Sequence, residues 1–309
     1  MLAILCPGQG AQHPGMFDLS GQAPAAQPLF QTAGELLGED PRTYVQHAGE
    51  QMFDNRAAQI LCVAQALAAY LAIGPLLPRR LIVAGYSVGE LSAWGIAGLL
   101  TPEGTLRVAK ARGDLMSQGS GPDDGLAFIR GLPLEAVQRL ASDHGVDVAI
   151  INPDDVTVVG GQRNALQAIC SAALAAGALR ADPLAVRVAS HTSCLAKVVP
   201  EFFAALQAAA PVPPPANIVL LSALNAQPVF SVPQASQALA DEIGHTLHWK
   251  DCLQCAYERG ARVFLELGPG RALANMVTRA YPDTAARSLD EFRSLEGVEQ
   301  WLSKHIEDA

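Results

Sequence analysis

The fold is decided by residues 81–90, which read Leu-Ile-Val-Ala-Gly-Tyr-Ser-Val-Gly-Glu. The first four are apolar and predict a short buried strand, and residues 91–96 predict a helix. Between them lies Gly85-x-Ser87-x-Gly89, so the serine stands in a tight strand-to-helix turn, a nucleophile elbow. The hydroxyl projects beyond the strand there, and the helix N-terminus directs free N–H groups at whatever forms on it. The segment predicts an α/β fold with a catalytic serine; the alternative is a packing turn with an idle hydroxyl.

The same pattern occurs at the start of the chain. Residues 2–6 are apolar and run directly into Pro-Gly-Gln-Gly at 7–10. Helices are predicted at 57–72 and at 102–116, the second behind a Thr101 cap. Buried strands that alternate with helices are typical of a parallel sheet.

A boundary is predicted at 117–125, which is rich in glycine, serine, proline and aspartate. The segments after it predict a strand at 126–129, a helix at 134–142, strands at 146–151 and 156–159, a helix at 165–176 and a strand at 184–188. This βαββαβ order is ferredoxin-like. Strands at 218–221 and 263–267 then resume the parallel sheet. We therefore predict a discontinuous parallel-sheet domain, 1–124 and 190–309, with an inserted subdomain at 125–189.

Composition excludes several classes of function. The 309 residues are 50% hydrophobic and 17% charged, as in ordinary globular proteins. A formal charge of −9 without a long basic run argues against nucleic acid as a partner. Apolar stretches are too short or too interrupted for a membrane span or a signal peptide. The expectation is a cytoplasmic protein with no membrane partner.

The six cysteines are scattered through apolar segments, so we expect reduced thiols. Cys252 and Cys255 form a Cys-x-x-Cys pair, but no second pair and no histidine at finger spacing accompany it. The sequence therefore gives no reason to expect a metal or a redox cofactor.

A serine nucleophile needs a base, normally a histidine within hydrogen-bond reach. Of the seven histidines, His191 follows the predicted insertion and precedes a predicted helix, where a chain can present a side chain to a cleft. His245 and His248 could lie near the end of the sheet, and the other four stand in polar surroundings typical of a surface. Position alone leaves His191 open between a base and a structural histidine.

Six short motifs follow one another along residues 2 to about 280: Pro7 to Gln12, Gly85 to Glu90, Arg112-Gly113, Asn152-Pro153, Ser190-His191 and Glu266 to Gly270. In order and spacing they resemble the malonyl-CoA:acyl carrier protein transacylase family. The resemblance implies an α/β-hydrolase-like large domain with a ferredoxin-like insertion. That architecture agrees with the organisation predicted from the segments themselves.

The resemblance also implies a role for each matching residue. Ser87 would be the acylated nucleophile and His191 its base, with the backbone N–H groups of Gln9 and Val88 as the oxyanion hole. Arg112 would bind the malonyl carboxylate, because a guanidinium offers two parallel hydrogen bonds. Without the resemblance, Arg112 is read more simply as a helix-surface arginine paired with a nearby acid.

The chain departs from the family pattern around Tyr86 and around Glu242, and a further position leaves the acyl group open. Tyr86 stands where malonyl-specific members usually have histidine, so the fit around the acyl group can differ. Glu242 stands where the family has a glutamine whose main-chain carbonyl orients the histidine, and a carbonyl survives the substitution. Residues 244–247 lack the usual proline, and Ala189-Ser190 leaves the choice between malonyl and bulkier acyl groups open.

The reaction that the resemblance implies is a ping-pong transfer. A malonyl group passes from malonyl-CoA to Ser87 and then to the phosphopantetheine thiol of an acyl carrier protein, with no cofactor of the enzyme's own. Carrier proteins are generally acidic, so a chain of charge −9 needs a local positive patch for docking. Arg187 and Lys197 are the candidates; the alternative is that they are solvated charges.

Two other functions stay open at the level of sequence. A serine thioesterase or esterase shares the elbow but needs an acid and then a late histidine, and His305 is the candidate for that position. A noncatalytic carrier-protein docking subunit would keep the fold without the chemistry. Fatty acid biosynthesis, polyketide biosynthesis and malonate decarboxylase all use the transacylase architecture, and Tyr86 favours a pathway other than the first.

Overall fold

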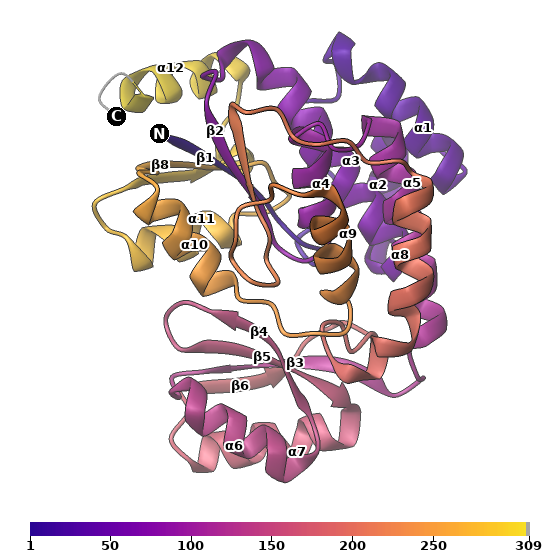
Figure 1. Cartoon of the computed structure of the whole chain (residues 1–309), viewed down its shortest axis with the longest axis vertical. Coiled ribbons are helices and arrows are strands. Elements are labelled where there is room, and N and C mark those ends of the chain that lie inside the picture. Colours follow the sequence, from indigo (N-terminus) through magenta and orange to yellow (C-terminus); the bar gives the residue numbers. More distant parts are fainter. Residues whose placement is uncertain (307–309) are drawn as a thin grey trace.

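The computed structural model describes residues 1–306 and shows two units, each built on its own sheet (Figure 1). The large unit holds a five-stranded sheet in the order β7-β2-β1-β8-β9. Its strands are β1 (Leu2–Cys6), β2 (Leu81–Gly85), β7 (Ile218–Leu221), β8 (Val263–Glu266) and β9 (Ala285–Ser288). All four strand pairs are parallel, which confirms the predicted parallel sheet. The carboxyl ends of β1 and β2 therefore meet at one edge, where the first glycine turn and the elbow follow.

Helices cover both faces of this sheet, so its strands are apolar throughout. On β1, Leu2, Ile4 and Cys6 belong to one core, and Ala3 and Leu5 belong to another on the opposite face. The helices of the large unit are α1 (Gln27–Leu37), α2 (Pro41–His47), α3 (Asn55–Ile73), α4 (Gly89–Ile96), α5 (Pro102–Gly119), α8 (Val199–Ala208), α9 (Val232–Asp241), α10 (Trp249–Glu258), α11 (Ala272–Ala280) and α12 (Leu295–Ile306). The predicted Thr101 cap is present, since its Oγ1 accepts from the N–H of Gly104 at 3.0 Å.

Helix α3 lies at the centre of the core that contains Leu2, Ile4 and Cys6 of β1. Together with the short 3-10 helix after it, the segment Asn55–Leu76 is long and apolar enough to cross a membrane by length and composition alone. However, 78% of its most apolar window is buried within the protein, against α1, α4 and α5. Burial of this kind is typical of a core helix in a globular domain.

The second unit has the predicted order βαββαβ: β3 (Asp124–Arg130), α6 (Leu134–His144), β4 (Asp147–Asn152), β5 (Val156–Gln162), α7 (Arg163–Ala175) and β6 (Arg180–Pro183). Its antiparallel sheet has the order β4-β5-β3-β6, and α6 and α7 cover the face turned away from the large unit (Figure 1). The other face contributes Leu126, Ile150 and Val158 to the core that contains Trp249 of the large unit. The insertion is thus packed onto the large unit through its sheet.

The last strand of this unit lies earlier than predicted. Instead of residues 184–188, the strand is Arg180–Pro183, which pairs with β3 at the sheet edge. An edge strand tolerates charge, and Arg180 and Asp182 form their own ion pair there. The apolar residues Leu184 and Val186, which suggested a strand, line a cavity between the units instead.

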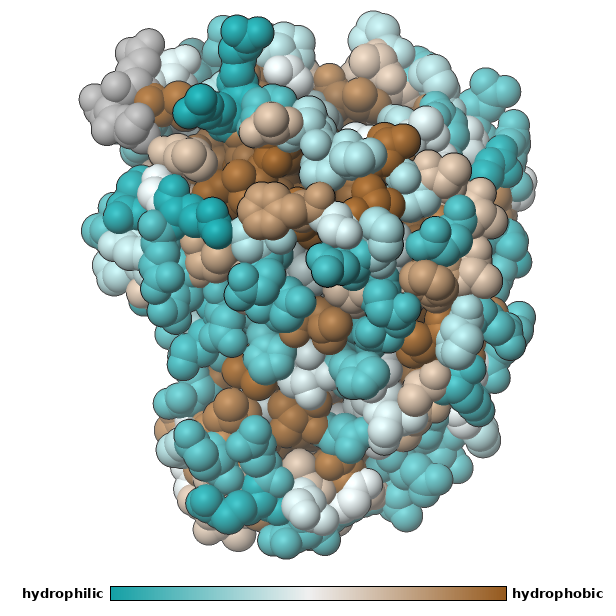
Figure 2. All heavy atoms as spheres, in the orientation of Figure 1, coloured by the Kyte–Doolittle hydropathy of each residue, from teal (hydrophilic) through white to brown (hydrophobic). Residues whose placement is uncertain are grey.

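Strand β9 and helices α1, α2, α9, α11 and α12 were not predicted from the sequence. Residues 307–309, which the predicted large domain includes, lie outside the described residues. On the face drawn in Figure 2, hydrophilic residues predominate and hydrophobic side chains form several separate groups between them.

Candidate active site

Ser87 lies in the turn between β2 and α4 with a backbone φ of 57°, in the left-handed region that non-glycine residues seldom adopt. The two flanking glycines allow this turn because neighbouring backbone approaches them closely. A Cβ on Gly89 would lie 2.1 Å from the carbonyl oxygen of Cys6, and one on Gly85 would lie 2.1 Å from that of Gly89. The nucleophile elbow expected from the sequence is therefore present, braced against the end of β1.

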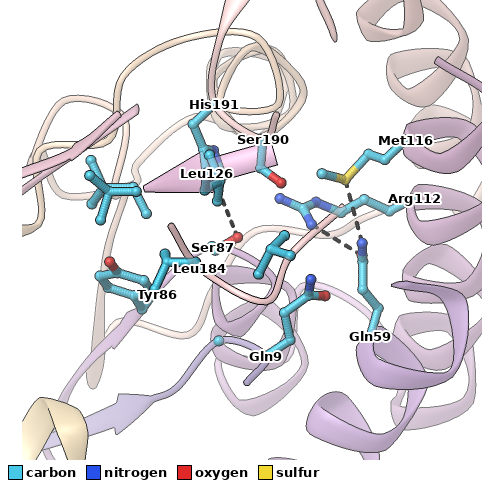
Figure 3. A pocket seen from close by; sticks show the side chains of 14 residues that line it. Gln9, Gln59, Tyr86, Ser87, Arg112, Met116, Leu126, Leu184, Ser190 and His191 are labelled. Atoms are coloured by element: carbon cyan, nitrogen blue, oxygen red, sulfur yellow. Dashed lines mark hydrogen bonds between the residues drawn. The ribbon is translucent and has the colours of Figure 1, made fainter. Parts of the chain in front are cut away.

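The structure brings Ser87 and His191 together. The serine Oγ lies 2.8 Å from His191 Nε2, as the dashed line in Figure 3 marks. The other ring nitrogen, Nδ1, lies 2.5 Å from the main-chain oxygen of Glu242. Because a carbonyl oxygen can only accept, Nδ1 carries the proton and Nε2 is left to accept from the serine hydroxyl. The expected role of the Glu242 main chain thus matches its position.

His191 is buried, and this burial decides its protonation. Burial, and then the charge of Arg112, lower the pKa of His191 to about 3, while the hydrogen bond to Glu242 acts in the opposite direction. The imidazole is consequently neutral at physiological pH and ready to take a proton.

A cavity of about 180 Å³ opens over Ser87 between the two units. Its walls come from both, and in Figure 3 Arg112 and Gln59 lie on one side of the serine and Tyr86 on the other. The residues that line it are Gly8, Gln9, Gln59, Tyr86, Ser87, Arg112, Met116, Leu126, Ile150, Val158, Leu184, Val186, Ser190 and His191.

Arg112 is not a surface residue of α5, which was the simpler interpretation of its sequence context. Its side chain is 1% exposed. Nη1 donates to Gln59 Oε1 at 3.1 Å, and Nη2 donates to Glu242 Oε1 at 3.0 Å. Its Nε has no acceptor among residues 1–306. The guanidinium is therefore held at the cavity wall by two bonds, with N–H groups to spare.

Glu242 touches both the histidine and the arginine, the first through its main chain and the second through its side chain. Glu90, on α4, is also buried, and its Oε2 accepts from the N–H of Ala223 at 2.6 Å. Burial raises the pKa of Glu90 to about 7. Burial, and then the charge of Glu90, raise the pKa of Glu242 well above its ordinary value.

The sequence interpretation did not single out Glu90, Gln59 or the side chain of Glu242. A signal for two of them existed. Glu90 and Gln59 are polar residues inside otherwise apolar helical segments, and a buried polar residue usually has a partner.

Tyr86 forms the wall opposite Arg112. Its ring packs edge-on against Trp249, with the ring centroids 5.4 Å apart and an interplanar angle of 82°. Burial raises the pKa of Tyr86 to about 12, so the phenol stays neutral. This side of the cavity therefore presents an uncharged aromatic surface to an acyl group.

The residues expected to form an oxyanion hole lie beside the serine. Gln9 lines the cavity, and Val88 directly precedes α4. In residues 1–306, the backbone N–H groups of Gln9 and Val88 meet no acceptor. Both donors are thus free to bind an oxyanion formed at Ser87.

The two candidate docking residues differ in position. Arg187 lines a second cavity of about 460 Å³, which shares Gln9, Leu126, Leu184 and Val186 with the first. Lys197 is exposed and lines neither of these two cavities. Arg163, which the sequence interpretation did not single out, lines the second cavity together with Arg187.

The remaining expectations concerned His305, the cysteines and a metal site. His305 packs against Trp301 on α12 and does not line the cavity over Ser87. All six cysteines are free thiols. Within residues 1–306, no group of three or more His, Cys, Asp or Glu side chains is placed to hold a metal ion.

An elbow serine hydrogen-bonded to a neutral histidine, on a parallel sheet with a ferredoxin-like insertion, defines the class of serine-dependent acyl-transfer proteins. The chain belongs to the acyl transferase domain family, whose model matches residues 4–291. It is 28% identical to a malonyl CoA-acyl carrier protein transacylase of Haemophilus influenzae, over 97% of this chain and 98% of the relative. It is 30% identical to a polyketide biosynthesis malonyl CoA-acyl carrier protein transacylase of Bacillus subtilis, over 93% and 99%.

A solved structure extends the comparison to a complex. The chain superposes with a TM-score of 0.89 and 25% identity on a malonyl transacylase in complex with its type II polyketide synthase acyl carrier protein, covering 100% of this chain and 99% of that one. The predicted α/β fold class is thereby confirmed over the whole chain.

Proposed function

We propose that this protein is a malonyl-CoA:acyl carrier protein transacylase. The observation that carries the proposal is the 2.8 Å contact between Ser87 Oγ and Nε2 of His191, beside a cavity whose wall holds the buried Arg112. The relatives supply the substrate class, since they are malonyl transacylases over nearly their full length.

In the first half-reaction, Ser87 Oγ attacks the thioester carbonyl of malonyl-CoA while His191 Nε2 takes the hydroxyl proton. The N–H groups of Gln9 and Val88 receive the tetrahedral oxyanion. When the C–S bond breaks, His191 returns the proton to the departing CoA thiolate and leaves malonyl-Ser87.

In the second half-reaction, the phosphopantetheine thiol of a carrier protein attacks the ester, and His191 moves the proton from that thiol to Ser87 Oγ. Arg112 holds the malonyl carboxylate by two parallel hydrogen bonds throughout. Side chains and backbone fill every role in this scheme, so it requires no cofactor of the enzyme's own.

The carrier protein is the proposed macromolecular partner. Arg187, at the second cavity, and Lys197, in the 3-10 helix Ser193–Val198 after His191, are the proposed contacts for its acidic surface. We also propose a cytoplasmic location, because all six cysteines are free and reduced thiols are typical of that compartment.

The test is the intact mass of the protein after brief incubation with malonyl-CoA, acetyl-CoA and methylmalonyl-CoA in competition, beside the Ser87→Ala variant. A malonyl adduct on the wild type alone is expected. Steady release of CoA without an adduct would favour a thioesterase, although His305 lies outside the site. Neither adduct nor release would favour a noncatalytic docking subunit.

A further inference from the structure

Behind the cavity wall, three charged side chains meet without access to water. Arg112 lies on α5, Glu90 on α4 and Glu242 directly after α9, and their side chains are between 0% and 1% exposed. Glu242 binds the guanidinium at 3.0 Å, and burial and then the charge of Glu90 raise the pKa of Glu242. Arg112 lines the cavity, whereas the two carboxyl groups lie behind it. Arg112 therefore borders the cavity on one side and binds Glu242 on the other.

The other groups that face this cluster carry no charge. Gln59 on α3 and Ser222 after β7 are neutral, and His191 is neutral because its pKa is lowered to about 3. Cys252 on α10 stays a thiol, because burial and then Glu90 raise its pKa well above the ordinary value. The net charge of the cluster thus depends only on how many protons the two carboxyl groups hold.

Two buried carboxyl oxygens without a donor lead us to infer one shared proton in the free site. Oε1 of Glu90 and Oε2 of Glu242 have no donor among residues 1–306, so two ionised carboxylates would repel each other with an unpaired oxygen on each. A single proton held between the carboxyl groups provides that donor and leaves one negative charge. That charge balances Arg112, and the empty site is neutral.

A malonyl group changes this balance and an acetyl group does not. The malonyl carboxylate brings one more negative charge to a guanidinium that is already neutralised. A buried, uncompensated charge is costly, and a buried carboxyl escapes the cost by accepting a proton.

Resting on the proposed function, we propose that Glu90 and Glu242 determine acyl specificity: their carboxyl pair takes up one proton from solvent when a carboxylate-bearing acyl group binds Arg112, and none when a neutral acyl group binds. Malonyl transfer is therefore favoured over acetyl transfer at low pH. The preference declines as pH rises, by up to about tenfold per pH unit, because one proton is taken up.

The first test measures the ratio of malonyl to acetyl adducts by intact mass, from about pH 5.5 to 8.5, with both CoA esters in competition at short times. Both donors carry the same CoA phosphates and use the same Ser87 and His191, so the ratio cancels those ionisations. A falling ratio is expected. A constant ratio with both adducts present would overturn the proposal, whereas the absence of both adducts would contradict the transacylase function itself.

Variants locate the proton. The double variant Glu90→Gln/Glu242→Gln keeps the main-chain carbonyl that His191 needs and leaves no carboxyl to titrate, so its ratio should be high and independent of pH. Glu266→Gln is the matched control, because Glu266 is also buried with its pKa raised to about 8, yet caps α11 away from the cavity. A decline that persists unchanged in the double variant would refute the assignment.

A second measurement does not depend on turnover. Binding of malonyl-CoA and of acetyl-CoA to the Ser87→Ala variant is followed by calorimetry in buffers of different ionisation enthalpy, near pH 7.5. The expected difference between the two ligands is up to one proton taken up per malonyl-CoA bound. Equal proton uptake by both ligands would overturn the proposal.

Discussion

Replacing Arg112 by methionine isolates the contribution of the guanidinium to acyl selection. Methionine keeps an unbranched apolar side chain in the space between α3 and α5 and removes every N–H donor. The perturbation acts on malonyl, which has a carboxylate, and spares acetyl, which has none. The Arg112→Met variant should therefore lose malonyl transfer selectively.

The structure sets the size of the effect. Of the N–H donors of Arg112, one on Nη1 is used by Gln59 and one on Nη2 by Glu242, while Nε has no acceptor in residues 1–306. At least two donors remain for a substrate carboxylate. At roughly 1.5 kcal/mol for each charge-assisted hydrogen bond, their loss amounts to about 3 kcal/mol, or roughly a hundredfold lower malonyl to acetyl ratio.

The assay is the competition between malonyl-CoA and acetyl-CoA, read as the two adduct masses on Ser87 at pH 7, with thermal unfolding to verify the fold. Arg112→Lys keeps the charge but not the planar fork, so it should recover only part of the ratio. Lys110→Met is the control, since Lys110 is a cation on the same helix that pairs with Asp114 at 2.7 Å. Equal losses of both adducts in Arg112→Met would refute the carboxylate clamp and make Arg112 a structural residue.

Three further outcomes are expected. Because the buried His191 keeps its neutral form far below pH 6.5, the acylation rate with acetyl-CoA should stay constant from about pH 8 to about pH 5; a rate that halves near pH 6.5 would show an exposed, ordinary imidazole. Gly89→Ala should unfold the elbow or lower the melting temperature by many degrees, because its Cβ would lie 2.1 Å from the Cys6 oxygen; an unchanged melting curve would contradict this packing. Arg187→Glu should raise KM for the carrier protein several-fold and leave the rate of malonyl-Ser87 formation unchanged, whereas an equal effect on both steps would place Arg187 at the donor site instead.

The elements that were predictable from the sequence are those with a local signal. Strands β1 and β2 combine an apolar run with a glycine turn, and the elbow of Ser87 needs nothing beyond its own flanks. Strand β9 reads Ala-Ala-Arg-Ser, a short edge strand without an apolar pattern, so sequence alone could not distinguish it from a loop. The sequence prediction placed the last strand of the insertion too late because Leu184 and Val186 are apolar. These side chains line the cavity and are not part of the sheet.

The active site likewise has a part that was predictable from the sequence and a part that was not. The serine and the histidine stand in recognisable motifs, and the structure places them in contact. The burial of Arg112 and its bonds to Gln59 and Glu242 join positions 53 and 130 residues away in the chain. Such contacts depend on how α3, α5 and the end of α9 pack, and no local pattern encodes that arrangement.

Glu242 serves the histidine with its peptide carbonyl and the arginine with its carboxyl, and only the second of these can be changed by exchanging the side chain. If the Glu242 carboxyl sets the acyl preference as proposed, a substitution at position 242 alters which acyl group is accepted, while the main-chain contact that orients the imidazole is kept. Turnover and substrate choice, which often trade against each other in enzymes, are separable at this position. On the proposed role of the carboxyl pair, a substitution at position 242 changes the choice of acyl donor without rebuilding the catalytic pair.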